Sequence, residues 1–228
     1  MSEAEAEVRS GATRQCVLEL YTSDGCSSCP PAERFISNLK GQVGVTILSF
    51  HVDYWDYLGW PDAYGSVTFS TRQRDIVQWT RQRSCYTPQI LVDMKDTPSW
   101  GKLRAQDLSA NRPAASVDIV LTRKGAAIDA TVTPKGGAPT RLAAYWAVTQ
   151  NNLTQDIKKG ENRGLKLSHD FVVRQYAPVA EFRGTQKTSL NVLADLMKDG
   201  CIANLVVFDP ATGVPLQALG VNIDAKPY

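Results

Sequence analysis

Cys26 and Cys29 lie three residues apart in the stretch TSDGCSSCPP, which spans residues 22–31. In a turn that leads into a helix, residues at this spacing lie about 5 to 6 Å apart on one face, so the two thiols can close a disulfide. The same spacing is also typical of half a zinc site, or of two buried thiols without chemistry. The interpretation therefore depends on the elements that flank the pair.

A strand, a turn and a helix are predicted around the cysteines. CVLELY at 16–21 is a β-type run, and PPAERFISNLK at 30–40 begins with prolines, which a first helical turn tolerates. VTILSFHV at 45–52 is a second strand of the continuous apolar kind found in buried parallel sheets. Because free N–H groups at a helix start stabilise a thiolate, we expect Cys26, exposed on the loop, to be the nucleophile and Cys29 to be the buried resolving thiol.

Metal binding is the alternative chemistry for the pair. Zinc normally takes four ligands, whereas the chain has no second CxxC, and its only histidines, His51 and His169, form no HxxxH motif. A redox pair is therefore favoured, and we assign no metal ligands. A copper or zinc site, or an interaction module with a vestigial pair, remains the alternative.

The rest of the chain divides into two predicted parts. Two helices and a strand are expected in FSTRQRDIVQWTRQR, WGKLRAQDLSAN and TPQILVDM. From Pro113 onward, short β-type stretches alternate with Gly, Pro, Asn and Asp, which is typical of an antiparallel sandwich. We therefore expect a flexible arm over 1–13, an α/β domain over 14–112 and a β-sandwich-like domain over 113–228.

VLELYTSDGCSSCPP, ILSFHVDYWDYLGWPD and YTPQILVD resemble DUF1223, a thioredoxin-like family of unknown function that is found largely in bacteria and is often secreted. These segments cover roughly residues 16–94, and GENRGLKLSHDFVVRQY and VFDPATG resemble the family's C-terminal half. The resemblance implies a thioredoxin fold followed by a β-rich domain. It implies no particular substrate.

The wider resemblance to thioredoxins implies roles for residues around the pair. Glu19 corresponds to a buried acid that assists deprotonation of the resolving cysteine, with a carboxylate paired to a nearby base as the alternative. Thr87 and Pro88 correspond to the threonine and cis-proline that face the cysteines, and with Tyr86 they are expected to bind an extended substrate. Cys85 is either a third redox thiol or a small buried hydrophobic residue.

An aromatic loop, HVDYWDYLGW at 51–60, follows the second strand. Because the carboxyl ends of parallel strands open on the same edge of a sheet, this loop should border the CxxC turn. Tyr54 and Trp55 are candidates to hold a peptide or small thiol, with a hydrophobic plug as the alternative. His51 is a candidate substrate-binding residue, proton shuttle or metal ligand (with Asp53 and Asp56), or else a hydrogen-bonded structural histidine.

Composition disfavours two classes of partner. A net charge of +2 and a pI near 8.2 fall short of the basic balance that advertises nucleic acid, and no apolar run is long enough to span a membrane. No signal peptide is visible, so an intracellular, cytoplasmic location is expected for the chain as given, or a secreted or periplasmic one if a signal was removed. We expect a protein or small-thiol disulfide as substrate, a glutathione- or thioredoxin-type reductant, and no cofactor besides the cysteine pair.

Overall fold

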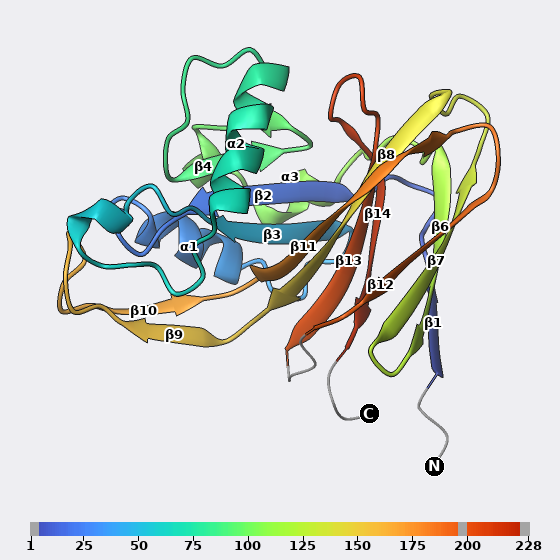
Figure 1. The fold of residues 1–228 in the computed structure, drawn as a ribbon. Coiled ribbons are helices and arrows are strands. Elements are labelled where there is room, and N and C mark those ends of the chain that lie inside the picture. Colours follow the sequence, from blue (N-terminus) through green and yellow to red (C-terminus); the bar gives the residue numbers. More distant parts are fainter. Residues whose placement is uncertain (1–4, 196–199, 224–228) are drawn as a thin grey trace.

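The computed structural model describes residues 5–195 and 200–223, and most of the regular structure there is β-strand (Figure 1). The strands are β1 (Glu5–Arg9), β2 (Cys16–Thr22), β3 (Val45–His51), β4 (Gln89–Val92), β5 (Lys95–Asp96), β6 (Val117–Lys124), β7 (Ala127–Pro134), β8 (Arg141–Gln150), β9 (Leu153–Asp156), β10 (Lys166–His169), β11 (Val172–Arg183), β12 (Thr188–Leu193), β13 (Cys201–Phe208) and β14 (Pro215–Asn222). The helices are α1 (Pro30–Ser37), α2 (Val67–Trp79) and α3 (Ala105–Ser109), with 3-10 turns at Asp56–Leu58 and Trp100–Lys102. Among these described helices α2 is the longest at 13 residues, and none could span a bilayer.

The segments predicted around the cysteines form β2, α1 and β3. Pro30 opens α1, where its missing N–H is no loss, and β2 and β3 run parallel with Cys16 opposite Val45. The helix predicted after the aromatic loop is α2, whose N-cap Ser66 accepts a hydrogen bond from the Thr68 N–H. The local elements are thus confirmed.

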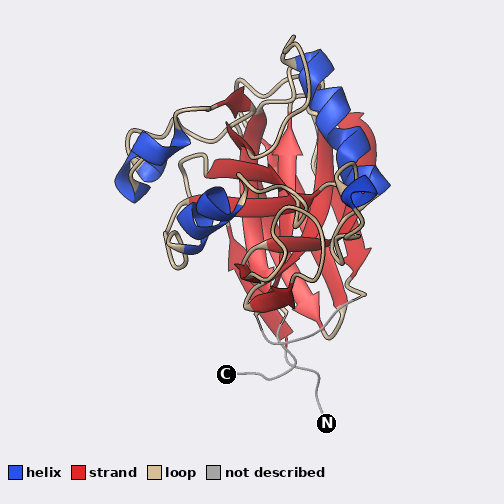
Figure 2. Ribbon diagram, turned by 90° about the vertical axis from the view of Figure 1, so that its left-hand side faces the viewer, coloured by secondary structure: helices blue, strands red, loops and turns tan. Residues whose placement is uncertain are grey.

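Helices α1 and α2 cover opposite faces of the sheet that contains β2 (Figure 2). Alternate residues of β2 divide between them, because successive side chains of a strand point to opposite faces. Leu18 belongs to the cluster that contains Ile36 of α1. Tyr21 belongs to the cluster that contains Ile76 of α2. The cysteine turn at the start of α1 is therefore on the first of these faces.

The sheet does not end at β3. Its order is β14-β13-β8-β11-β3-β2-β4-β5, and the join between the two halves of the chain is the parallel contact of β11 with β3, where Val172 pairs with Ser49. The Ser49 N–H also donates to the Phe171 carbonyl at 2.8 Å. An apolar strand such as β3 with an open edge would leave N–H and C=O groups unpaired, and β11 pairs with this edge at Ser49.

A second sheet, β1-β6-β7-β12, packs against one end of the long sheet. The core between them is apolar and contains Ile119 from β6, Val132 from β7 and Trp146 from β8. Strand β8 is buried on both faces, since Tyr145 and Ala147 pack in the cluster that also holds residues of α2. Strands β9 and β10 form a separate hairpin beside α1 (Figure 1).

The predicted fold class, an α/β thioredoxin-like domain followed by a separate β-rich domain, is wrong. The structure is mostly β, and one large mixed sheet takes strands from both sides of the expected boundary between 14–112 and 113–228. Residues 5–9, expected within a flexible arm, form β1 and pair with β6, whereas residues 1–4 lie outside the described part of the chain. Local sequence patterns predicted most of the longer strands, but not β1, and they do not specify which strand pairs with which.

Candidate functional site

The cysteine pair sits in a tight turn between β2 and α1. The Cys26 N–H donates to the Ser23 carbonyl at 3.1 Å, and the Cys29 N–H donates to the Cys26 carbonyl at 3.2 Å. Cys29 is the N-cap of α1, and its carbonyl accepts from Ala32. The two sulfurs are joined in a disulfide across a Cα–Cα distance of 5.5 Å, within the usual range for such a bond.

Cys26 and Cys29 are both buried in the disulfide-bonded structure. Cys26 is 1% exposed and Cys29 is 0% exposed, so the expected exposure of Cys26 is wrong. Between them, Ser27 and Ser28 are exposed, and the Ser28 hydroxyl lies 3.3 Å from the Cys26 sulfur. The disulfide therefore lies just beneath a surface formed by two serines.

The loop between β9 and β10 closes over the same turn. The Asn162 side chain donates to the carbonyls of Asp24 at 2.8 Å and Cys26 at 3.0 Å. Next to it, the Glu161 carboxylate accepts from the Ser27 N–H at 3.1 Å. The backbone of the turn is thus held by residues more than 130 positions further along the chain.

The segment that contains Thr87 and Pro88 lies beside the turn, as expected. The peptide bond between them is cis, which confirms the prediction, and the Ser28 hydroxyl donates to the Thr87 carbonyl at 3.5 Å. The Thr87 hydroxyl accepts from Trp55 Nε1 at 2.8 Å. This contact connects the aromatic loop to the same edge of the site.

Gly25 and Trp55 bring the aromatic loop against the cysteine turn. A Cβ atom at position 25 would come within 2.8 Å of Trp55 Cβ and 3.3 Å of the Trp55 carbonyl oxygen. Only glycine allows this close approach, because real Cβ contacts are longer. The prediction that the loop borders the turn is confirmed.

Glu19 lies on the other face of the sheet. Its carboxylate binds Arg72 Nη2 at 2.5 Å and accepts hydrogen bonds from Tyr145 at 2.7 Å and Tyr21 at 2.8 Å. Arg72, on α2, is buried, with its guanidinium 4.4 Å from the centroid of the Tyr145 ring. The structure thus matches the alternative for Glu19, a strand carboxylate paired with a base.

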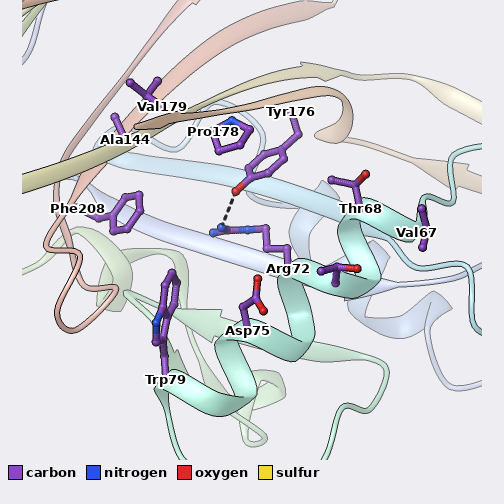
Figure 3. A pocket seen from close by; sticks show the side chains of 11 residues that line it. Val67, Thr68, Arg72, Asp75, Trp79, Ala144, Tyr176, Pro178, Val179 and Phe208 are labelled. Carbon is purple, nitrogen blue, oxygen red and sulfur yellow. Dashed lines mark hydrogen bonds between the residues drawn. The ribbon is translucent and has the colours of Figure 1, made fainter. Parts of the chain in front are cut away.

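A pocket of about 420 Å³ opens on that same second face, between α2 and strands β8 and β11 (Figure 3). Arg72 points into it and donates to the Tyr176 hydroxyl at 3.0 Å, and Trp79 and Phe208 form one side. No residue of the cysteine turn lines it among the described residues. The pocket is therefore separate from the candidate redox site.

A buried polar cluster lies next to the turn on the α1 side. His51, at the end of β3, is fully buried, and its Nδ1 lies 2.8 Å from the Asp62 carboxylate. That carboxylate also accepts from the Asp24 N–H at 2.8 Å. Burial by itself lowers the pKa of His51, but the Asp62 charge outweighs it and raises this pKa, while His51 lowers the pKa of Asp62 despite its burial.

His169, at the end of β10, extends the cluster. Its Nε2 lies 3.1 Å from Asp24 Oδ1 and its Nδ1 lies 2.6 Å from Glu33 Oε2. The other oxygen of Glu33 accepts from the Thr22 hydroxyl at 2.6 Å. Burial lowers the pKa of His169, and the contacts with Asp24 and Glu33 outweigh it, raising this pKa to about 10. The cluster therefore holds carboxylates and imidazoles whose charges depend on one another.

Residues 17–208 match the protein family described as "Protein of unknown function (DUF1223)". The chain belongs to this family. Protein AGR_C_4864 from Agrobacterium tumefaciens shares its fold, with 24% identity, a TM-score of 0.70 and coverage of 96% of this chain and 99% of that one. HBP35 of Porphyromonas gingivalis is also similar, with 14% identity, a TM-score of 0.62 and coverage of 94% of this chain and 77% of that one. No curated protein matches the sequence.

The other predicted residues of this DUF1223 protein lie near the site in different roles. The Tyr54 hydroxyl donates to Gln73 at 3.1 Å, and burial, followed by the neighbouring Cys85, raises the pKa of Tyr54 to about 12. Tyr86 donates its hydroxyl to Asp96 at 2.8 Å. Cys85 is a free, half-buried thiol whose pKa is raised by burial. His51 has no exposed surface, so it contacts no substrate directly in this state.

Several site residues of the DUF1223 protein were not predicted, namely Asp24, Glu33, Asp62, Glu161 and Asn162. Asp24 stands within TSDGCSSCPP, two positions before Cys26, and Asn162 stands within GENRGLKLSHDFVVRQY, so both were in segments that resemble the family. The only hint of this cluster in the composition was the low number of histidines: the chain has two, and both lie in the cluster.

Proposed function

We propose that this DUF1223 protein is a thiol-disulfide oxidoreductase that works through Cys26 and Cys29. The observation that carries the proposal is the disulfide itself, formed in a short turn at the start of α1 between β2 and the helix. The N-terminus of a helix stabilises a thiolate, and the thiolate is the form of cysteine that attacks a disulfide. The Ser28 hydroxyl, 3.3 Å from the Cys26 sulfur, adds a donor for a thiolate at Cys26.

The reaction balances with two electrons. In the reduced protein, the Cys26 thiolate attacks one sulfur of a substrate disulfide, so a mixed disulfide forms and the other substrate sulfur leaves as a thiolate. Cys29, once deprotonated, attacks the Cys26 sulfur, re-forms the internal disulfide and releases the second substrate thiolate. An external dithiol or glutathione then reduces the internal disulfide for the next cycle.

Access to the sulfurs sets a requirement on the substrate. Cys26 is 1% exposed while Ser27 and Ser28 are exposed, so an attacking or attacked group reaches Cys26 past these two serines. Trp55 and Thr87, joined by their hydrogen bond, lie at the same edge and are the groups that a peptide or small thiol would contact. A flexible substrate disulfide suits this approach better than one fixed in a folded core.

Trapping of mixed disulfides tests the proposal. Cys29→Ser should accumulate mixed disulfides through Cys26, because the resolving thiol is absent, whereas Cys26→Ser should trap none. Cys16→Ser is the matched control, since Cys16 is buried and free. Equilibration of the wild type in glutathione buffers supplies a second measurement. A disulfide that stays oxidised down to about −300 mV, as structural disulfides do, would contradict the proposal.

A further inference from the structure

We propose that Glu33, His51 and His169 bind one divalent transition-metal ion, with Asp62 and Asp24 orienting the two imidazole rings. The site goes beyond the redox function and does not depend on it, because no sulfur is among the ligands. It lies beside the cysteine turn, on three elements that meet there: α1 carries Glu33, β3 ends at His51 and β10 ends at His169.

The donor atoms converge in a small volume. One ligand atom from each of Glu33, His51 and His169 lies within 4.8 Å of the other two, and the two imidazole centroids are 5.1 Å apart. Bonds of about 2.0 to 2.1 Å in a tetrahedral zinc site place ligand atoms roughly 3.3 Å apart. Glu33 Oε2 and His169 Nδ1, which lie 2.6 Å apart, are closer than this, so metal binding requires these two side chains to rotate apart.

Each imidazole has one nitrogen directed to an orienting carboxylate; the other nitrogen has no partner in His51 and faces the proposed ligand Glu33 in His169. Nδ1 of His51 contacts Asp62 at 2.8 Å, while Nε2 of His51 is buried and has no hydrogen-bond partner. Nε2 of His169 lies 3.1 Å from Asp24 Oδ1, and its Nδ1 faces Glu33. Metal-binding histidines almost always have this arrangement, with the second nitrogen held by a carboxylate or carbonyl.

The contacts of His169 with its carboxylates are close but poorly aligned. Both of its nitrogens lie within ion-pair distance of carboxylates, yet neither is aligned for a hydrogen bond. On Glu33, Thr22 occupies Oε1, which leaves Oε2 toward His169. Once Glu33 Oε2 and His169 Nδ1 have moved apart, two bonds to an ion replace a close contact that is not a hydrogen bond.

The charge of the cluster suits a divalent cation. Three carboxylates are buried together, with exposed fractions of 0% for Asp24, 4% for Glu33 and 6% for Asp62. Within the described residues their ion pairs are with the two histidines. A divalent ion bound among these residues supplies positive charge that offsets the buried carboxylates. Tyr64 packs on both rings, at 5.4 and 5.6 Å, and shields the cluster from water.

The ligand types indicate the class of metal. Two imidazoles and a carboxylate suit Zn²⁺ and Fe²⁺, whereas Ca²⁺ and Mg²⁺ take oxygen ligands. Zinc is the better first probe, because it has no redox chemistry that could oxidise the nearby thiols.

Zinc retention by the full chain is the experiment. The oxidised protein is loaded with Zn²⁺ alone and desalted against a weak chelator, and its metal content is then measured. We expect one zinc per chain, with X-ray absorption that shows nitrogen and oxygen donors at about 2.0 to 2.1 Å. No retained zinc, or sulfur donors at about 2.3 Å, overturns the proposal.

Variants assign the ion to the cluster. His51→Gln and His169→Gln should abolish retention, and Asp62→Asn should weaken zinc binding about 10 to 100-fold, as loss of an orienting group does. The double variant Cys26→Ser with Cys29→Ser is the control and should retain one zinc. Full retention in a folded His51→Gln protein, or loss of zinc in the cysteine double variant, contradicts the site. If His51→Gln does not fold, the zinc affinity of Asp62→Asn and the X-ray absorption spectrum of the wild-type protein test the site instead.

Because the cysteine double variant cannot perform disulfide exchange, zinc retention in it separates the two proposals. Failure to trap mixed disulfides leaves this result untouched. Failure to retain zinc, in turn, leaves the trapping result untouched.

Discussion

The side chain of Asn162 donates to the backbone carbonyl of Cys26 at 3.0 Å, across 136 residues of sequence. The same nitrogen lies 2.8 Å from the Asp24 carbonyl, and Asn162 is 3% exposed. The loop between β9 and β10 therefore holds the backbone of the turn that carries the disulfide. Strand pairing places this loop there, since β10 leads directly into β11, the partner of β3.

Asn162→Ala should destabilise the protein by about 1 to 3 kcal/mol, because it removes the side-chain donor of the buried Asp24 carbonyl and one of the two donors of the Cys26 carbonyl. Denaturant unfolding measures the change. Asn191→Ala, at an exposed position of β12, is the control and should shift stability by no more than about 0.5 kcal/mol. Equal effects of the two substitutions would show that the contact with the turn contributes nothing.

Gly25→Ala should also lower the free energy of unfolding by about 1 to 3 kcal/mol. The added methyl group would clash with Trp55 Cβ and displace the aromatic loop away from the cysteine turn. The intrinsic tryptophan fluorescence of the folded Gly25→Ala protein should also differ from that of the wild type, because Trp55 lies in the displaced loop. Gly11→Ala is the matched control, as a Cβ there meets no atom within 4 Å. A Gly25→Ala protein with unchanged stability and fluorescence would contradict the close packing of the loop.

Glu19→Gln should cost about 3 to 5 kcal/mol, since it leaves the buried Arg72 charge without its partner. The exchange activity per folded molecule should stay the same, because Glu19 lies on the face covered by α2 and the cysteines lie at the start of α1. Combined measurements of unfolding and mixed-disulfide trapping check this. Loss of trapping in a stable Glu19→Gln protein would instead assign Glu19 to the reaction.

The free thiols should react in a fixed order with pH. Burial, and next the Asp93 charge, raise the pKa of Cys16 to about 12, so at pH 10 only about 1% of this thiol is ionised. Alkylation of the oxidised protein should therefore label the half-buried Cys85 increasingly as the pH rises from 8 to 10, and leave Cys16 unlabelled. Peptide mapping measures both, with unfolded protein as the control in which both react. Equal labelling of Cys16 and Cys85 in the folded protein would contradict this order.

Local structure followed from the sequence because its causes are local. Pro30 at the first helical position, the apolar run of β3 and the three-residue spacing of Cys26 and Cys29 act within a few residues of each other. Most of the longer strands, the helices and the cysteine turn were therefore predictable, whereas the place of Thr87 beside the turn was implied by the resemblance to thioredoxins. Parallel pairing of β2 with β3 also placed the aromatic loop at the turn.

The sheet was not predictable in the same way. RLAAYWAVTQ, which forms β8, is apolar almost throughout and is buried on both faces, whereas a strand with one face in water alternates. Such a run indicates that two layers cover the strand, but it does not specify the layers. One is the sheet that contains β6 and β7, and the other includes α2, so the two expected domains share a sheet.

The sequence by itself determined that two cysteines stand in a turn before a helix, and that this chain can form a disulfide there. Only the tertiary structure decided which polar groups surround that turn. His51 meets His169 because β11 pairs with β3 and brings the end of β10 beside the end of β3. Contacts between residues so far apart in sequence depend on strand partners and register, which are selected by burial of the whole core and not by the residues that meet.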